Sequence, residues 1–283
     1  MKKLLVTGAL ALLGAVVPAG MVGTAGASVT HDPILGKHVV HLNRLSAGAL
    51  HNGTAVQSPN WSGYADSGDT FTSVSAQWIE PAVTCHAGGG GLLGLGSSAT
   101  YAAFWVGLDG YSSTSVEQDG ADSDCLASGA PNYYAWYEMY PASPVDLSQT
   151  TYPVTPGDHM AAAVKSNTAG TSFTLALVDT STQHAGWMFS TTVSSSGLPR
   201  SSAEWVAEAP TSCSLLIFCA TVGLSNFGSV AFSNAQATDV AGKTGSISSF
   251  TDTPLQMASN GSVEATPSPL TAGGTAFTDT WGS

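Results

Sequence analysis

The sequence predicts an all-β protein built from many short strands. Runs in which apolar and polar residues alternate recur along the chain, and Gly, Pro, Asn or Asp bounds most of them. Regular strands and turn signals of this kind are typical of β-sandwiches and barrels. The chain is also rich in Ser, Thr, Gly and Val and poor in strong helix formers, which favours strands over helices.

The N-terminus predicts a secretory signal peptide over residues 1–27. Lys2 and Lys3 precede an apolar run, which ends in the small-residue cleavage pattern Ala-Gly-Ala at 25–27. An uncleaved membrane anchor is the alternative. No other apolar run is long enough to span a membrane, so we expect a secreted, extracellular protein that makes no membrane contact after signal cleavage.

Residues 28–56 differ in composition from the rest of the chain. They contain Lys37, Arg44 and four histidines, whereas the remainder is acidic. A pro-segment that covers an acidic domain would have this composition, and a disordered tail is the alternative. Residues 57–283 follow without a long linker and are predicted to form one domain.

This domain carries few charges, and nearly all of them are negative. Only 9% of the whole chain is charged, and all acidic residues except Asp32 lie beyond residue 56. Lys165, Arg200 and Lys243 are the only cations there. Nucleic acid and anionic membranes are therefore not expected as partners. Few salt bridges would be lost in acid, which fits a protein that works at low pH, although negative charge could equally serve solubility alone.

The four cysteines fit an oxidising compartment and allow three disulfide pairings. We favour a local link between Cys213 and Cys219 and a longer one between Cys85 and Cys125. Their spacing matches no metal site, and we expect neither a metal nor another cofactor. The Gly-rich stretch at 86–100 lacks the GK[ST] sequence that closes a phosphate-binding loop.

Alternation within single strands places carboxylates and aromatic rings on the less apolar faces. In SAEWVAEA, Glu204 and Glu208 share one face, and Trp205 faces the other way. Three further strands carry polar or aromatic residues in the same way: Trp105 and Asp109 in AFWVGLD, Gln118 and Asp122 in SVEQDGAD, and Trp136 and Glu138 in YYAWYEMY. If these faces lie together, they form an acidic, aromatic groove that suits a polymer chain.

Two polymers suit such a groove. Polysaccharides stack on aromatic rings and are cleaved by carboxylate pairs, whereas peptide cleavage in acid needs a carboxyl group with a raised pKa. The sequence contains neither the GxSxG motif of serine hydrolases nor the HExxH motif of zinc peptidases, so it does not support either catalytic system. His86, His159 and His184 are interpreted as surface or loop residues. For any single carboxylate, a solvated sheet face is the simpler interpretation.

Six motifs together resemble a known family of peptidases. They occur in the order NWSGYA (60–65), FWVGLDG (104–110), EQDGAD (117–122), YAWYEMYP (134–141), SAEWVAEAP (202–210) and FGSVAFSNA (227–235). In this order they are similar to the glutamic peptidases, or eqolisins, which are acid-active endopeptidases known best from fungi. The resemblance covers most of residues 60–235. It implies a concanavalin A-like sandwich of two antiparallel sheets.

The resemblance also implies a catalytic pair. Glu204 would act as general base and then as general acid, and Gln118 would donate an amide N–H to the developing oxyanion. The residues that match supports of the family's cleft, and are expected to bind substrate, are Trp105, Asp109, Asp122, Trp136 and Glu138.

Some acids fall outside this assignment. Gln118-Asp119-Gly120 replaces the family's usual QTG, and because Asp119 should face away from Gln118, we expect the change to be tolerated. Glu80 is an added acid to which no role is assigned. Glu208 lies roughly 13 Å along the strand from Glu204, so we do not expect it to be the base.

The sequence therefore predicts a secreted acid endopeptidase that acts on polypeptides as a monomer. Three alternatives remain: a lectin-like carbohydrate-binding module, a glycosidase that uses Glu204 with Glu138 or Asp109, and an inactive member of the family.

Overall fold

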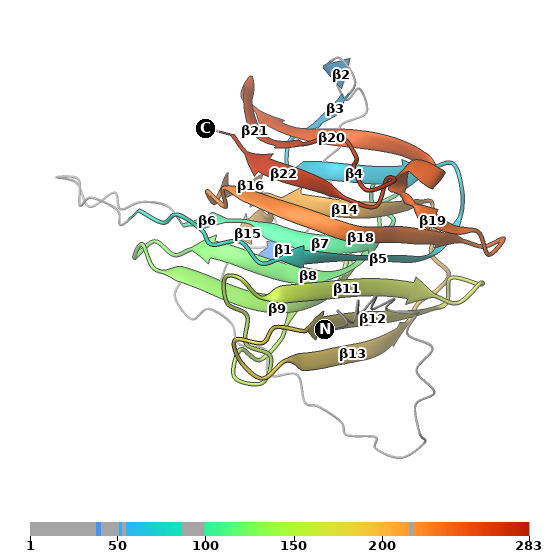
Figure 1. Cartoon of the computed structure of the whole chain (residues 1–283), viewed down its shortest axis with the longest axis horizontal. Helices are drawn as coiled ribbons and strands as arrows, with labels where there is room; N and C mark the ends of the chain where they lie inside the picture. Colours follow the sequence, from blue (N-terminus) through green and yellow to red (C-terminus); the bar gives the residue numbers. More distant parts are fainter. Residues whose placement is uncertain (1–37, 41–50, 53–54, 87–98, 215–217, 283) are drawn as a thin grey trace, which may run out of the picture.

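The computed structural model of the chain describes residues 38–40, 51–52, 55–86, 99–214 and 218–282 (Figure 1). Nearly all regular structure in these residues is β-strand, with one short 3-10 helix, η1 (Ile247–Ser249). The all-β prediction is thus confirmed. No helix within the described residues is long and apolar enough to cross a membrane. The predicted signal peptide lies outside the described residues.

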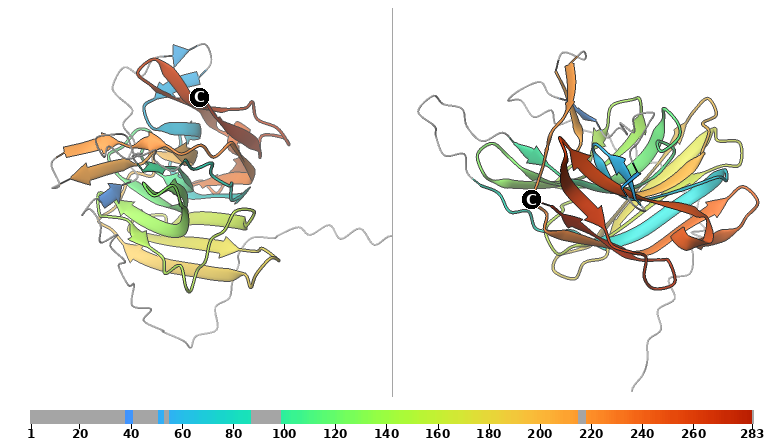
Figure 2. Two further views of the ribbon diagram at one scale, coloured as in Figure 1. Left: turned by 90° about the vertical axis from the view of Figure 1, so that its left-hand side faces the viewer. Right: turned by 90° about the horizontal axis from the view of Figure 1, so that it is seen from above.

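Two large antiparallel sheets form the molecule. The first sheet has the order β10 (Val145–Asp146), β9 (Pro131–Tyr140), β8 (Val116–Cys125), β7 (Ala103–Leu108), β14 (Ser202–Glu208), β4 (Trp61–Ser67) and β20 (Thr251–Ser259). The second sheet has the order β22 (Phe277–Trp281), β18 (Ser229–Asp239), β5 (Phe71–Ile79), β11 (His159–Ser166), β12 (Ser172–Asp179) and β13 (Trp187–Ser194). β21 (Ser262–Pro267) pairs with both β20 and β22 and so joins the sheets along one side. Figures 1 and 2 show β20 to β22 at one end of the molecule and β13 at the other.

Short strands extend this frame. Six of them add to the large sheets or to one another: β2 (His51–Asn52), β3 (Ala55–Ser58), β6 (Thr100–Tyr101), β17 (Gly223–Leu224), β19 (Thr244–Ser246) and the hairpin strand β16 (Phe218–Thr221). β16 pairs with β15 (Thr211–Ser214), and β15 pairs on its other side with β1 (His38–Val40). The N-terminal segment therefore contributes a strand to the hairpin that directly follows β14.

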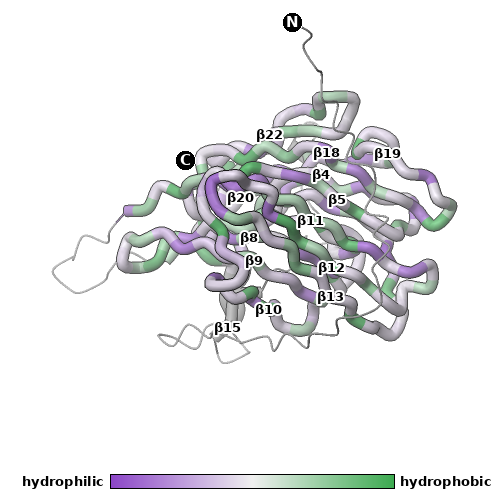
Figure 3. Tube along the Cα trace, turned by 60° about the horizontal axis from the view of Figure 1, so that its bottom comes forward, coloured by the Kyte–Doolittle hydropathy of each residue, from purple (hydrophilic) through white to green (hydrophobic). Residues whose placement is uncertain are grey.

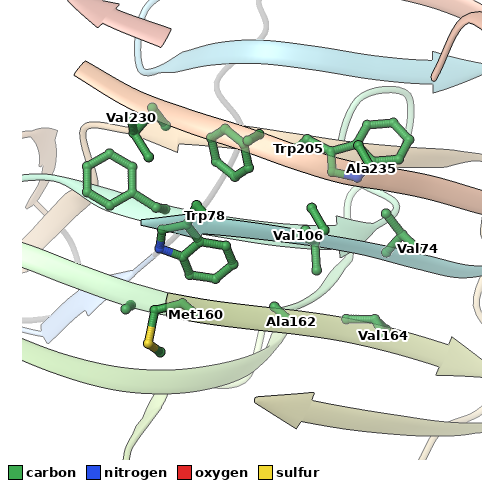
Figure 4. Close-up of a cluster of buried hydrophobic side chains, with 14 of the residues drawn as sticks. Val74, Trp78, Val106, Met160, Ala162, Val164, Trp205, Val230 and Ala235 are labelled. Atoms are coloured by element: carbon green, nitrogen blue, oxygen red, sulfur yellow. The ribbon is translucent and has the colours of Figure 1, made fainter. Parts of the chain in front are cut away.

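The core lies between the two sheets, and the alternation of the strands places it there. On β14, Trp205 points into this core, together with alternate residues of β5, β7, β11 and β18 (Figure 4). The apolar stretch of β11 runs through the middle of the molecule (Figure 3). Glu204 and Glu208 face the opposite side of the first sheet, as the sequence predicted. A second apolar cluster lies on that outer face and includes Trp61, Trp105 and Trp136.

Several carboxyl groups are buried with the core rather than exposed to water. Asp119 does face away from Gln118, but it is fully buried, and burial raises the pKa of its carboxyl well above the ordinary value. Glu80 is also fully buried, where it accepts hydrogen bonds from Trp78 Nε1 (2.8 Å) and Ser123 Oγ (2.6 Å). Glu80, to which the sequence assigned no role, thus ties the end of β5 to β8.

Burial has the same electrostatic effect at four more positions. It raises the pKa of Glu80 and of Asp279 to about 7, of Asp66 to about 8 and of Glu117 to about 9. Neither carboxyl oxygen of Asp66 has a hydrogen-bond partner among the described residues. A neutral, protonated acid is therefore the form that these sites accommodate best.

One of the two predicted disulfides is confirmed. Cys85 and Cys125 are bonded, which links the segment after β5 to the end of β8. Cys213 and Cys219 lie directly opposite each other in the β15–β16 pairing. Their bond stays a prediction, because their side chains lie outside the described residues.

Because these carboxyl groups are buried, we predict that the protein is most stable at low pH. Unfolded Asp and Glu titrate near pH 4, about 3 to 5 units below the folded values of about 7 to 9. The folded protein thus holds protons that the unfolded chain releases. Stability is full below about pH 4 and is lost as the pH rises through about 7 to 9. Each unit of difference is worth about 1.4 kcal/mol, so we expect a loss of several kcal/mol in denaturant titrations between those limits.

The variant Asp66→Asn isolates one of these groups. Asn resembles the protonated acid, so the variant should match the wild type near pH 4 and exceed its stability near pH 9. Asp69→Asn, at an exposed position, removes only a minor contribution to the raised pKa of Asp66 and should change the pH dependence far less than Asp66→Asn. A stability that rises from pH 4 to pH 9 would contradict this account.

Candidate active site

The predicted catalytic residues meet on the outer face of the first sheet. Gly107 on β7 lies directly opposite Gln118 on β8 and directly opposite Glu204 on β14. Two strand spacings therefore separate the Cα atoms of Gln118 and Glu204, about 10 Å. Gly107 places no side chain of its own between the acid and the amide, and the edge of the Trp105 ring lies over this position.

The absence of a side chain at Gly107 is required by its neighbours. A Cβ at this position would lie 2.9 Å from Trp105 Cζ3 and 3.2 Å from Gln118 Cβ. Gly120 is equally constrained, since its Cβ would lie 2.6 Å from Trp105 Cβ. The two glycines thus make room for the Trp105 ring beside Gln118.

Glu204 is held by the backbone of the loop that follows β7. The N–H of Tyr111 donates to Glu204 Oε1 (3.3 Å), and Oε2 has no hydrogen-bond partner among the described residues. Glu204 is fully buried, and burial raises the pKa of its carboxyl well above the ordinary value; the nearby Asp109 and Glu117 act in the same direction. One fixed oxygen and one available oxygen suit a group that exchanges a proton with a ligand.

Gln118 is oriented by its neighbour on β9. The two residues Gln118 and Glu138 are direct cross-strand partners, and Gln118 Nε2 donates to Glu138 Oε2 (2.8 Å). Both side chains are fully buried. The bond fixes which end of the carboxamide carries the donor and leaves Oε1 on the other side.

Asp122 and Trp136 form the next hydrogen-bonded pair on this face of the first sheet. Asp122 accepts hydrogen bonds from Trp136 Nε1 (2.6 Å) and from Tyr134 Oη (2.9 Å). Trp136 is fully buried and lies opposite Gly120. Asp122 therefore fixes the rings of Tyr134 and Trp136 on β9.

Glu208 fixes the ring of Trp105 in the same way. It accepts from Trp105 Nε1 (2.8 Å) and from Asn60 Nδ2 (3.2 Å). The ring of Trp61 packs edge-on against Trp105, with 4.8 Å between the ring centroids. These bonds give Glu208 a supporting role, in keeping with the expectation that it is not the base.

Asp109 departs from the role of a groove residue. It follows the end of β7 with a φ of 68°, and its carboxylate accepts from the backbone N–H groups of Arg200 (2.6 Å) and Ser201 (2.8 Å) and from Ser201 Oγ (3.0 Å). We interpret Asp109 as the residue that fixes the turn before β14, and hence the start of the strand that carries Glu204.

The structure thus brings six of the seven residues that the resemblance implied to one face of the first sheet: Glu204, Gln118, Trp105, Asp122, Trp136 and Glu138. Asp109 lies beside this face and binds the turn before β14. The structure adds Tyr111, Asn60 and Gly107, which sequence reasoning did not identify. Asn60 stands in the quoted motif NWSGYA, and Gly107 in FWVGLDG, so motif membership was a usable signal for both. Tyr111 contributes its backbone N–H, and because every residue except proline has one, the sequence could not indicate this contact.

Comparison with known proteins identifies the family of the chain. The Peptidase A4 family matches residues 59–277. Aspergillopepsin-2 from Aspergillus niger is 33% identical over 201 residues, which are 66% of this chain and 67% of that protein.

Solved structures are similar over most of the chain. Scytalido-glutamic peptidase with a peptide-based transition state analog has 28% identity and a TM-score of 0.62. SCP-B, a member of the eqolisin family in complex with the tripeptide Ala-Ile-His, has 26% identity and a TM-score of 0.59. Each similarity covers 79% of this chain and 98% of the other. The predicted β-sandwich is thus confirmed.

The three hydrogen bonds that Asp109 accepts from Arg200 and Ser201 hold the turn before β14 like a clamp. We therefore predict that removing the Asp109 carboxylate lowers both stability and activity. Asp109→Ala leaves three buried or half-buried donors without their acceptor, so we expect a cost of about 2–4 kcal/mol in the free energy of unfolding. Peptidase activity should fall as well, because the start of β14 is no longer fixed. Asp69→Ala, at an exposed carboxylate, should stay within about 0.5 kcal/mol of the wild type. Equal stability of the two variants would refute the clamp.

Proposed function

This chain belongs to the Peptidase A4 family, and on that premise we propose that it is an acid endopeptidase with Glu204 and Gln118 as its catalytic pair. One observation carries the proposal. Gln118 and Glu204 flank the side-chain-free Gly107 on one face of one sheet. A scissile peptide bond laid across Gly107 would meet an acid on one side and an amide donor on the other.

The chemistry follows from the two side chains. Glu204, when ionised, takes a proton from a water molecule as the water oxygen attacks the scissile carbonyl carbon. Gln118 donates an N–H to the oxyanion that forms, and the bond to Glu138 holds the amide in that orientation. The protonated Glu204 then returns its proton to the amine nitrogen as the C–N bond breaks.

The pH range follows from the same groups. The amide of Gln118 does not titrate, so it stays a donor in acid. Glu204 must be ionised to accept a proton, and burial raises its pKa. The rising limb of the pH–rate profile should therefore lie above the pKa of a free glutamate, about 4.3.

The carbohydrate-binding alternatives fit the site less well. A sugar platform needs an exposed aromatic face, whereas Trp105 and Trp136 are fully buried. Their indole N–H groups are bonded to Glu208 and Asp122. The two rings therefore act as walls of the site.

We further propose that the protein is secreted as a monomer and that residues 28–56 are a pro-segment. The strand β1 pairs with β15, with Val40 opposite Thr211, and β15 begins three residues after Glu208. In the full chain Glu204 and Gln118 are both fully buried. A polypeptide can reach them only if part of the chain moves, and we propose that removal of residues 28–56, whose strand β1 pairs with β15, allows that movement.

The catalytic assignment predicts two severe losses. Glu204→Gln should lower kcat for denatured casein in acid by about 10²–10⁴-fold, because the base is lost. Gln118→Ala should lower it by about 10²–10³-fold, because an oxyanion donor is lost. Glu264→Gln, the same change on β21 outside the site, is the control and should retain activity. Wild-type activity in a folded Glu204→Gln variant would exclude Glu204 as the base.

The pro-segment predicts a lag in activity. Full-length protein transferred from neutral pH to about pH 5 should gain activity only as fragments ending near residue 56 appear, which mass spectrometry and casein cleavage would follow together. Immediate full activity of a chain that still begins at Ser28 would show that removal is not the activating step.

A further inference from the structure

Three chemically reactive side chains converge at one end of the second sheet, away from the sheet that carries Glu204. Asp158 immediately precedes β11, Asp179 is the last residue of β12, and His184 lies in the connection from β12 to β13. One ligand atom from each lies within 4.8 Å of the other two. His184 Nε2 is 2.9 Å from Asp158 Oδ1 and 3.5 Å from Asp179 Oδ2.

Neighbouring groups fix the two carboxylates in this orientation. The N–H of Thr155 donates to Asp158 Oδ2 (2.7 Å), and the N–H of Ser181 donates to Asp179 Oδ1 (2.8 Å). The hydroxyls of Thr155 and Ser181 add further bonds to the same carboxylates. The other oxygen of each acid is thereby turned towards His184.

The imidazole is oriented in a complementary way. His184 Nδ1 lies 3.1 Å from the carbonyl oxygen of Ala185, which places a hydrogen on Nδ1 and directs Nε2 at the two acids. Gln183 Nε2 also donates to Asp158 Oδ1, at 3.3 Å. Asp179 is 2% exposed, and its Oδ2 is buried and accepts no hydrogen bond among the described residues, although His184 Nε2 lies 3.5 Å from it.

A buried carboxylate oxygen without a hydrogen bond must either be protonated or lie beside a positive charge, and a metal ion between the three side chains would supply that charge. We propose that Asp158, Asp179 and His184 bind a divalent transition-metal ion such as Zn²⁺ through Asp158 Oδ1, Asp179 Oδ2 and His184 Nε2. In a tetrahedral site with metal–ligand bonds of about 2.0–2.1 Å, neighbouring ligand atoms lie about 3.3 Å apart. Two of the three separations, 2.9 and 3.5 Å, bracket that value, and the third is no more than 4.8 Å.

The surroundings match a metal site in two further respects. A metal-bound histidine commonly donates its other ring N–H to a backbone carbonyl, and ligating carboxylates are themselves hydrogen-bonded. The side chain of His184 is 26% exposed, which gives an ion a path from solvent, while both carboxylates are buried. One imidazole with two carboxylates favours Zn²⁺ over Mg²⁺ or Ca²⁺, which prefer oxygen ligands alone.

The bound ion would brace the end of the second sheet. It would join the start of β11, the end of β12 and the loop to β13. That end is already tied to β5, because Glu80 N–H donates to Asp158 O (2.9 Å) and Gly157 N–H donates to Glu80 O (2.8 Å). The site serves stability and takes no part in the proposed peptide hydrolysis.

Calorimetric titration of the full chain with Zn²⁺ at about pH 7.5, where free imidazole is neutral, tests the proposal. The wild type should bind one equivalent more than His184→Ala and Asp179→Asn, and Zn²⁺ should raise the Tm of the wild type but not of these variants. His86→Ala removes another exposed imidazole and should bind as the wild type does. Ser181→Ala should weaken binding by about 10–100-fold, through loss of a bond to a ligand.

The comparison between variants makes the result decisive even if histidines of the N-terminal segment also bind Zn²⁺. Equal stoichiometry and affinity in the wild type and folded His184→Ala, or no binding by either, would overturn the proposal and leave a His–Asp ion pair. Because His184 lies outside the catalytic site, either result is independent of casein cleavage, which His184→Ala should retain.

Discussion

The register of three neighbouring strands is the constraint on which the candidate site depends. β7 places Gly107 opposite both Gln118 and Glu204, so the two functional side chains emerge on the same face. A slip of one residue in either pairing would turn one of them into the core between the sheets. The register is fixed by what lies on the other face, where Trp205 and Phe104 are packed in the apolar core. Packing on one side of the sheet thereby determines chemistry on the other.

The second constraint is electrostatic and explains why acid suits both the fold and the proposed reaction. The interior holds carboxyl groups such as Asp66, Glu117 and Asp119, whose pKa values are raised by burial. They are neutral in acid and become costly when they ionise. Arg200, whose charge acts on Glu117, donates hydrogen bonds from its guanidinium to the backbone carbonyl oxygens of Asn167 and Thr168. Acid thus keeps the framework neutral, while Glu204 must still lose its proton to act.

Much of this arrangement could be predicted from the sequence. Alternation in SAEWVAEA correctly separated Glu204 and Glu208 from Trp205, because a strand turns successive side chains to opposite faces. The ordered motifs then indicated which strands belong to one groove. Alternation cannot predict which partner a buried polar group will bind or how deeply it will be buried. Asp109 was expected beside a substrate but binds the turn at 200–201, and Asp119 faces the core. Such contacts join residues far apart in the chain, so local patterns carry no record of them.

The central claim is that Glu204 and Gln118 act together on one peptide bond. A double-mutant cycle on kcat/KM in acid, with Glu204→Gln, Gln118→Ala and the double variant, tests it most directly. Groups that serve one transition state are strongly non-additive, so the double variant should be about as impaired as the worse single variant. If the two losses instead multiply, the residues act independently, and the account of a shared site across Gly107 is contradicted.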